Sequence, residues 1–142
     1  MIKERKEKME KVRVFLKQDG EEFQGQGYWQ KQGEDYQLQF TYKEEDSTVE
    51  VLFIHHNDGT CSIREFSKEK ELYLYLQEGW EEGYLKTTVG MMLFVTKLEK
   101  IEQIEKEDQR IYEIGYQLGQ SEADSLLHEF VLIIEKNSNG NE

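Results

Sequence analysis

Two histidines and the only cysteine of the chain lie on either side of one predicted hairpin. His55 and His56 precede the turn signal Asn57-Asp58-Gly59, and Cys61 follows it. A two-residue turn would place His56 opposite Cys61, whereas a three-residue turn would place His55 there. Cross-strand neighbours have Cβ atoms about 4.5–5.5 Å apart, which permits a thiol–imidazole pair in either register.

The setting of this hairpin argues against chemistry at Cys61. Hairpin ends face solvent, and a nucleophile there lacks an oxyanion hole and a wall that excludes water. We therefore interpret Cys61 as a small hydrophobic residue beside solvated histidines. Two histidines and a thiolate could bind a metal ion, but no carboxylate with ligand spacing completes the set. The sequence predicts no metal site and no cofactor.

His128 shares one face of a predicted strand with four apolar residues, and we expect it to be buried. Its neighbours on that face are Leu126, Phe130, Leu132 and Ile134. A single histidine on an apolar face is more often a satisfied core residue than a catalyst. The sequence supplies no nucleophile, metal set or oxyanion donor to accompany it. We predict no catalytic residue, and an enzyme that uses His128 as its acid or base is the least favoured function.

Arg64 and three aromatic residues are the other candidates for ligand binding. Arg64 alternates with its neighbours inside a strand, and an inward arginine could hold a carboxylate by a bidentate contact. The favoured interpretation is an outward Arg64 paired with a cross-strand acid. Inward-facing Trp29, Tyr42 and Tyr116 could line an apolar cavity with polar tips, or could simply fill the core of a small barrel. The candidate ligand-binding residues are Trp29, Tyr42, Tyr116, His128 and Arg64.

The elements that must position these residues are short strands. About ten runs of alternating apolar and polar residues follow one another, each ended by a turn signal, and the chain contains no proline. Residues 36–43 show the pattern most clearly, because their apolar side chains recur at every second position. Gly25 and Gly27 would share one face of a strand, which is typical of a sharp bend. The charged stretch 99–105 is the ambiguous one, a short strand or an irregular connection. We predict an all-β antiparallel barrel of about 8–10 strands.

Length and charge narrow the class of protein. The 142 residues suit one barrel domain at 9–136, between a charged leader at 1–8 and a disordered polar tail at 137–142. The net charge of −12 would repel phosphate backbones and anionic lipid, so we expect neither nucleic acid nor membranes as partners. The N-terminus lacks the apolar segment of a signal peptide, and no run of about 20 apolar residues exists. We expect a cytoplasmic protein.

One block of the sequence resembles a known family. From Tyr84 through Thr88, Gly90 and Thr96 to Ile101, the spacing is similar to a signature of the YwiB-like family of bacterial proteins. Upstream, Gly27-Tyr28-Trp29 and the aromatic run at 38–44 look like the second and third strands of that family. The resemblance implies a calycin-type (lipocalin-like) barrel for residues 12–134. It implies no activity.

Two functions therefore compete ahead of catalysis. The favoured one is a non-catalytic binding module for a small, mostly apolar molecule held inside the barrel. The alternative is a protein–protein interaction or self-associating structural protein with a filled barrel, a homodimer for example. Tyr73 and Tyr75 suggest this alternative, because both lie on the strand face opposite Leu72, Leu74 and Leu76.

Overall fold

The computed structural model describes residues 9–137, which form ten strands and no helix. The expected leader at 1–8 and the tail beyond Asn137 lie outside the described residues. The strands are β1 (Glu10–Gln18), β2 (Glu21–Gln32), β3 (Asp35–Glu44), β4 (Ser47–His55), β5 (Cys61–Phe66), β6 (Lys70–Leu76), β7 (Glu81–Thr87), β8 (Gly90–Glu105), β9 (Gln109–Gly119) and β10 (Leu126–Lys136).

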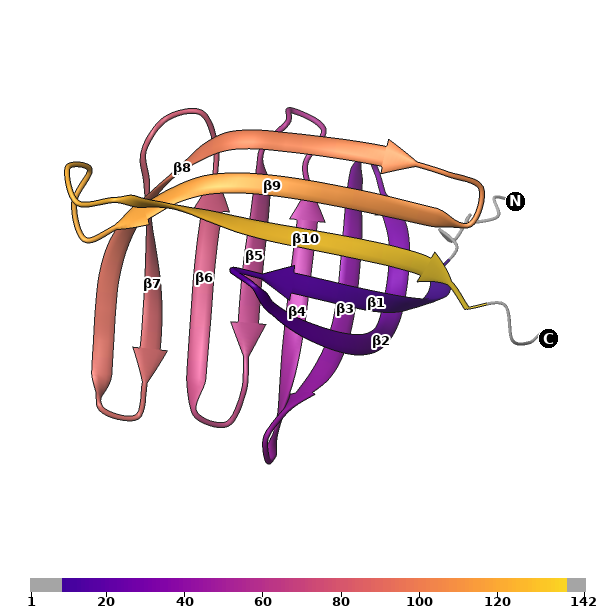
Figure 1. Cartoon of the computed structure of the whole chain (residues 1–142), viewed down its shortest axis with the longest axis horizontal. Coiled ribbons are helices and arrows are strands. Elements are labelled where there is room, and N and C mark those ends of the chain that lie inside the picture. Colours follow the sequence, from indigo (N-terminus) through magenta and orange to yellow (C-terminus); the bar gives the residue numbers. More distant parts are fainter. Residues whose placement is uncertain (1–8, 138–142) are drawn as a thin grey trace, which may run out of the picture.

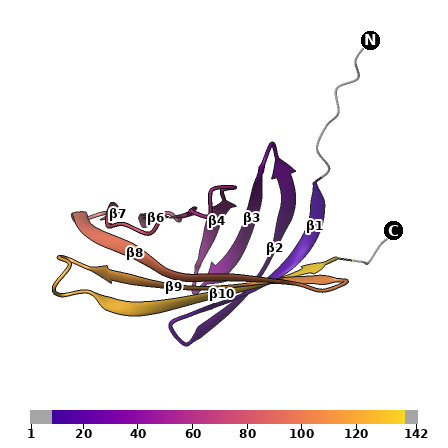
Figure 2. The same ribbon diagram turned by 90° about the horizontal axis from the view of Figure 1, so that it is seen from above.

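The ten strands form one closed antiparallel barrel, which confirms the predicted fold class. Each strand pairs with the next along the chain, and β1 pairs with both β2 and β10 to close the sheet. Strands β3 to β7 run side by side, and β9 and β10 cross in front of them at a steep angle (Figure 1). Seen from above, β8 bends from the first layer into the second (Figure 2).

The bend expected at Gly25 and Gly27 is present in β2, which curves strongly around the barrel (Figure 1). A Cβ atom on Gly27 would lie 1.9 Å from the carbonyl oxygen of Gln39, and one on Gly25 would lie 2.1 Å from that of Thr41. The backbones of β2 and β3 therefore approach so closely that only glycine fits at these two positions.

The ambiguous stretch 99–105 is the second half of a single long strand. β8 runs for 16 residues, and its register with β9 shifts between Leu98 and Lys100. This bulge lets both Leu98 and Ile101 pack against the core while the charged residues between them face solvent. Hydrogen bonding to β9 thus makes this stretch a strand, which its composition alone does not decide.

The interior is filled by the alternate side chains of every strand. Its largest members are aromatic, and they include Tyr112, Phe40, Phe53 and Phe130. Two polar side chains are buried among the described residues, Glu65 and Thr96. The hydroxyl of Thr96 donates a hydrogen bond to the carbonyl oxygen of Tyr75 at 3.0 Å. No helix of the described chain could cross a membrane.

Candidate ligand-binding end of the barrel

The β4–β5 hairpin adopts the three-residue turn, so His55 lies opposite Cys61. The backbone N–H of His56 donates to the carbonyl oxygen of Thr60 at 2.9 Å, and Gly59 takes a φ of +92°. Nδ1 of His55 forms a hydrogen bond with the hydroxyl of Tyr112 at 2.9 Å. Cys61 is fully buried, and burial raises the pKa of its thiol to about 12. A thiol in that setting packs as a hydrophobic residue and is a poor nucleophile.

The end of the barrel that holds this hairpin is closed by stacked side chains. Trp29 is buried and stacks on Tyr36 at 5.2 Å between ring centroids. The guanidinium of Arg110 also lies over the Trp29 ring, 4.6 Å from the ring centroid. Trp29 is therefore part of a packed cluster, which favours the filled-core interpretation for this candidate.

Arg64 lies on the outer face of β5, since its neighbours Ile63 and Glu65 are the inward, buried residues. Its guanidinium stacks over the ring of Tyr73 at 4.9 Å, and that ring also lies 5.8 Å from Tyr84. The favoured outward interpretation agrees with this placement, but the partner is an aromatic ring where we expected an acid. An outward Arg64 does not reach a ligand inside the barrel.

His128 is only partly buried, with 29% of its side chain exposed. Its ring stacks on Tyr116 at 5.6 Å between centroids, and its Nδ1 lies 2.8 Å from Oδ2 of Asp19. The expected full burial of His128 is wrong. The ladder between β1 and β10 reaches only from Lys136 to Phe130, so β1 does not cover residue 128. Position 128 therefore lies at the rim of the barrel.

Glu65 is an inward-facing carboxylate that the candidate set missed. It is 2% exposed, and its Oε2 has no hydrogen-bond partner among the described residues. Burial raises the pKa of Glu65, while the Lys70 ammonium and the Gln18 side chain oppose the rise. The available signal was alternation, because Cys61 and Ile63 place Glu65 on the apolar face of its strand.

Tyr42 and Tyr116 lie close enough to Glu65 to feel its charge. Burial is the main cause that raises the pKa of both phenols, and the carboxylate of Glu65 adds to the rise in each. Both rings are buried. Tyr42, Tyr116 and His128 therefore surround one end of the barrel together with Glu65, whereas Trp29 and Arg64 lie elsewhere.

The inner wall next to Glu65 becomes progressively exposed. Glu65 pairs with Leu72, Leu72 with Leu85, and Leu85 with Met92, so these residues form one row across β5 to β8. Leu72 and Leu85 are half-buried, and Met92 is 47% exposed. The wall opens here because the first residues of β8 pair with β7 alone, and the ladder with β9 begins only at Val95.

Leucines of β9 and β10 continue the opened wall on its other side. Leu118 pairs with Leu126, and Leu126 is 70% exposed although it lies on the inward face of β10. We call the five apolar residues around this opening the apolar rim: Leu72, Leu85, Met92, Leu118 and Leu126. The structure thus combines an exposed apolar wall with a buried carboxylate at its inner end, one of whose oxygens has no hydrogen-bond partner among the described residues.

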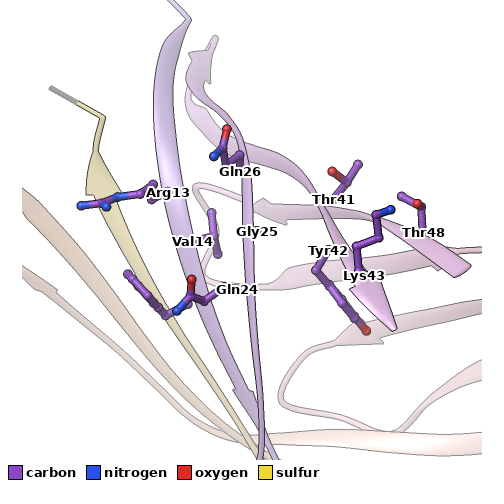
Figure 3. A pocket seen from close by; sticks show the side chains of 10 residues that line it. Arg13, Val14, Gln24, Gly25, Gln26, Thr41, Tyr42, Lys43 and Thr48 are labelled. Atoms are coloured by element: carbon purple, nitrogen blue, oxygen red, sulfur yellow. The ribbon is translucent and has the colours of Figure 1, made fainter. Parts of the chain in front are cut away.

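A separate hollow of about 430 Å³ lies over the outer face near Gly25. It is lined mainly by outward-facing side chains of β1 to β3, among them Arg13, Gln26 and Lys43. The ring of Tyr42 points away from Lys43, toward the interior (Figure 3). Its lining is largely polar and lies on the outer surface of the barrel, away from the packed interior. Among residues 9–137, no three His, Cys, Asp or Glu side chains are grouped so as to hold a metal ion.

Comparison with known proteins supports the fold. No family model and no curated protein matches the sequence. The crystal structure of the YwiB protein from Bacillus subtilis superimposes with a TM-score of 0.75, covering 92% of this chain and 95% of that one. The chain has a YwiB-like fold. At 14% identity the likeness to YwiB concerns the fold alone, and the calycin relationship stays a prediction.

Proposed function

We propose that the protein is a non-catalytic binding module that holds a small, mostly apolar molecule against the apolar rim. One observation carries this proposal: inward-facing apolar side chains are exposed at one end of the barrel, while the rest of the interior is packed. Met92 and Leu126 are the clearest cases. Exposed apolar side chains gathered at one place commonly mark a binding surface, and small-molecule sites are lined mainly by apolar residues.

The filled core places the ligand at the end of the barrel and not at its centre. Aromatic side chains occupy the middle, and the cluster around Trp29 closes the far end. A ligand at the rim would lie near Tyr116 and His128, two of the candidates named from sequence. Each apolar side chain that it covers would contribute about 25 cal/mol per Å² of area removed from water.

Neighbouring residues on opposite faces allow a sharp test with the neutral fluorescent probe N-phenyl-1-naphthylamine. Leu126 and Leu127 are both exposed leucines, one on the inner face and one on the outer face of β10. Met92 and Met91 form the same kind of pair on β8. Saturable binding is expected, and Leu126→Gln and Met92→Gln should weaken it at least fivefold.

The outer-face variants Leu127→Gln and Met91→Gln are the matched controls, and they should bind the probe like the wild-type protein. A protein that shows no saturable binding would contradict the proposal. Equal losses in the inner-face and outer-face variants would contradict it as well, because the probe would then be adsorbing to exposed side chains in general.

Self-association is a second candidate function, and the free edge of β8 supports it. Residues 90–94 pair with β7 on one side only, and Met91 and Leu93 are exposed on the outer face. A paired strand from a second copy would satisfy the free backbone groups. Sedimentation velocity over a wide concentration range tests this, and a Met91→Lys variant should dissociate any dimer that forms through this edge. A monomer at every concentration would contradict it.

A further inference from the structure

We propose that Glu65 receives the protonated amine of the bound molecule, so that the ligand class is an amphiphilic cation with an ammonium head and an apolar body. This inference rests on the proposed function, since it assigns the head group of the molecule held at the apolar rim.

The first support is that one carboxylate oxygen of Glu65 has no hydrogen-bond partner, although the Gln18 side chain bonds to the group, while the nearby basic groups have partners elsewhere. Its Oε2 accepts no hydrogen bond among the described residues. The Lys70 ammonium pairs with Glu44 at 3.9 Å, and the His128 ring pairs with Asp19 at 2.8 Å. Arg64, the neighbour in sequence, stacks on Tyr73 outside the barrel. The buried carboxylate is therefore left with acceptor capacity that the protein itself does not use.

An ammonium group is the chemical group that suits this unused acceptor capacity of Glu65. A carboxylate taken out of water is costly unless a cation and hydrogen-bond donors compensate it. A protonated amine supplies both at once, since its N–H groups donate charge-assisted bonds to carboxylate oxygens. Burial disfavours the charged form of Glu65, and a ligand cation would restore it.

The electrostatic surroundings favour a cation over an anion. Glu44 and Glu21 act on the phenol of Tyr42, and Asp19 acts on that of Tyr116 in the same direction as Glu65. Within residues 9–137, Lys70 is the one basic group that acts on Glu65 in the opposite sense. With a net charge of −12 over the whole chain, the field at this end would attract amines and repel fatty acids.

The row of residues beside Glu65 indicates how the ligand lies. From Glu65 the inner wall continues through Leu72 and Leu85 to the exposed Met92, one residue on each strand from β5 to β8. Neighbouring strands lie about 4.8 Å apart, so this row spans roughly 14 Å. A linear alkyl chain can follow it, with its head at the buried acid and its tail at the solvent-exposed methionine.

Calorimetric titration with three probes of equal chain length tests the assignment: 1-decylamine, 1-decanol and decanoate, each below its micelle concentration at neutral pH. The wild-type protein should bind decylamine at least tenfold more tightly than decanol, and decanoate more weakly than either. Glu65→Gln should lose the preference for the amine and still bind decanol. Glu50→Gln, which removes an exposed acid from the outer face of β4, should keep it.

The outcomes separate this inference from the proposed function. Equal binding of amine and alcohol, or a preference that survives Glu65→Gln, would overturn the assignment of Glu65 while leaving a binding module in place. An equal loss in Glu50→Gln would overturn it too, because the preference would then reflect net charge. Failure of every probe to bind would overturn the proposed function itself.

A second readout keeps the test decisive if Glu65→Gln does not fold. In the wild-type protein, the ¹³C-methyl resonance of Met92 should shift on titration with decylamine, and that of Met91 on the outer face should not. Equal shifts at the two methyl groups would place the amine on the outer surface and contradict the assignment.

Discussion

The ring of His128 in β10 lies 2.8 Å from the carboxylate of Asp19 in the β1–β2 turn, and this contact joins two strands beyond the end of their ladder. The other oxygen of Asp19 accepts a hydrogen bond from the backbone N–H of Glu129 at 3.1 Å. Asp19 itself adopts a φ of +49°, so the turn presents its side chain to the neighbouring strand. Asp19 thus links the β1–β2 turn to β10 next to the proposed ligand-binding end.

Removing this contact should cost a small amount of stability. His128→Ala is expected to lower the free energy of unfolding by about 1 kcal/mol, because the pair is partly exposed and screened by solvent. Urea denaturation measures the change. Glu129→Ala keeps the backbone bond to Asp19 and is the control, with no comparable loss. A loss as large in the control would show that the site is sensitive to any truncation.

Glu65→Gln should stabilise the protein at neutral pH. Burial raises the folded-state pKa of Glu65 above its ordinary value of 4.5, so the folded chain retains a proton that the unfolded chain releases. The stability associated with that proton is present below pH 4.5 and is lost as the pH rises through the folded pKa. The advantage of Glu65→Gln should therefore grow from acid to neutral pH in urea titrations.

The sign of this effect also tests whether Lys70 neutralises Glu65 in solution. If the Lys70 ammonium moved from Glu44 to form an ion pair with Glu65, the glutamine variant would be less stable than the wild-type protein at pH 7. The double variant Glu65→Gln with Lys70→Gln then gives the coupling between the two side chains, which we expect to be small.

His55 should make stability fall on mild acidification. Burial lowers the pKa of His55 below its ordinary value of 6.5, and the charge of His56 adds to the effect. The unfolded chain then takes up a proton before the folded one does. The contribution of His55 is present above pH 6.5 and is lost as the pH falls through that value toward the folded pKa.

His55→Gln is the variant that tests this, since glutamine can still bond to Tyr112 but does not titrate. The difference in unfolding free energy between wild-type and variant should narrow between pH 7 and pH 5. A difference that stays constant over this range would show that His55 does not change its charge there. The variant His56→Gln, at a half-buried position, controls for removal of a histidine from the same hairpin.

Gly27→Ala should be strongly destabilising, because its Cβ would lie 1.9 Å from a backbone oxygen of β3 that cannot move away freely. We expect a loss of about 2–3 kcal/mol or more in thermal or urea unfolding. Gly79→Ala is the matched control, since the nearest atom to its Cβ would be a flexible side-chain nitrogen at 3.7 Å. Equal stability of the two variants would contradict the close approach of β2 and β3.

The local pattern of residues was enough to predict the strands, because a strand has a side-chain period of two that any segment displays by itself. The alternation at residues 36–43 correctly predicted β3, and the paired glycines correctly predicted the bend in β2. The stretch 99–105 was left open between a short strand and an irregular connection, because its charges suit an exposed segment of either kind. Only hydrogen bonding to β9 decides it.

The same limit applies to the residues at the proposed site. Alternation placed Glu65 on the face of Cys61 and Ile63, but sequence left open which face of that strand points inward. Similarly, it left open whether His55 or His56 lies opposite Cys61, and it counted Trp29 and Arg64 with Tyr42, Tyr116 and His128. These questions depend on contacts between residues far apart in the chain.

By itself, therefore, the sequence determined the all-β class, most of the strand positions and the acidic character of the protein, all of which are local or summed properties. The tertiary structure decided that the barrel closes through β1 and β10, that one end is packed around Trp29, and that the other leaves an apolar rim beside a buried Glu65. The physical reason is register. Where each ladder begins and ends sets which side chains are covered, and only the closed sheet sets where ladders end.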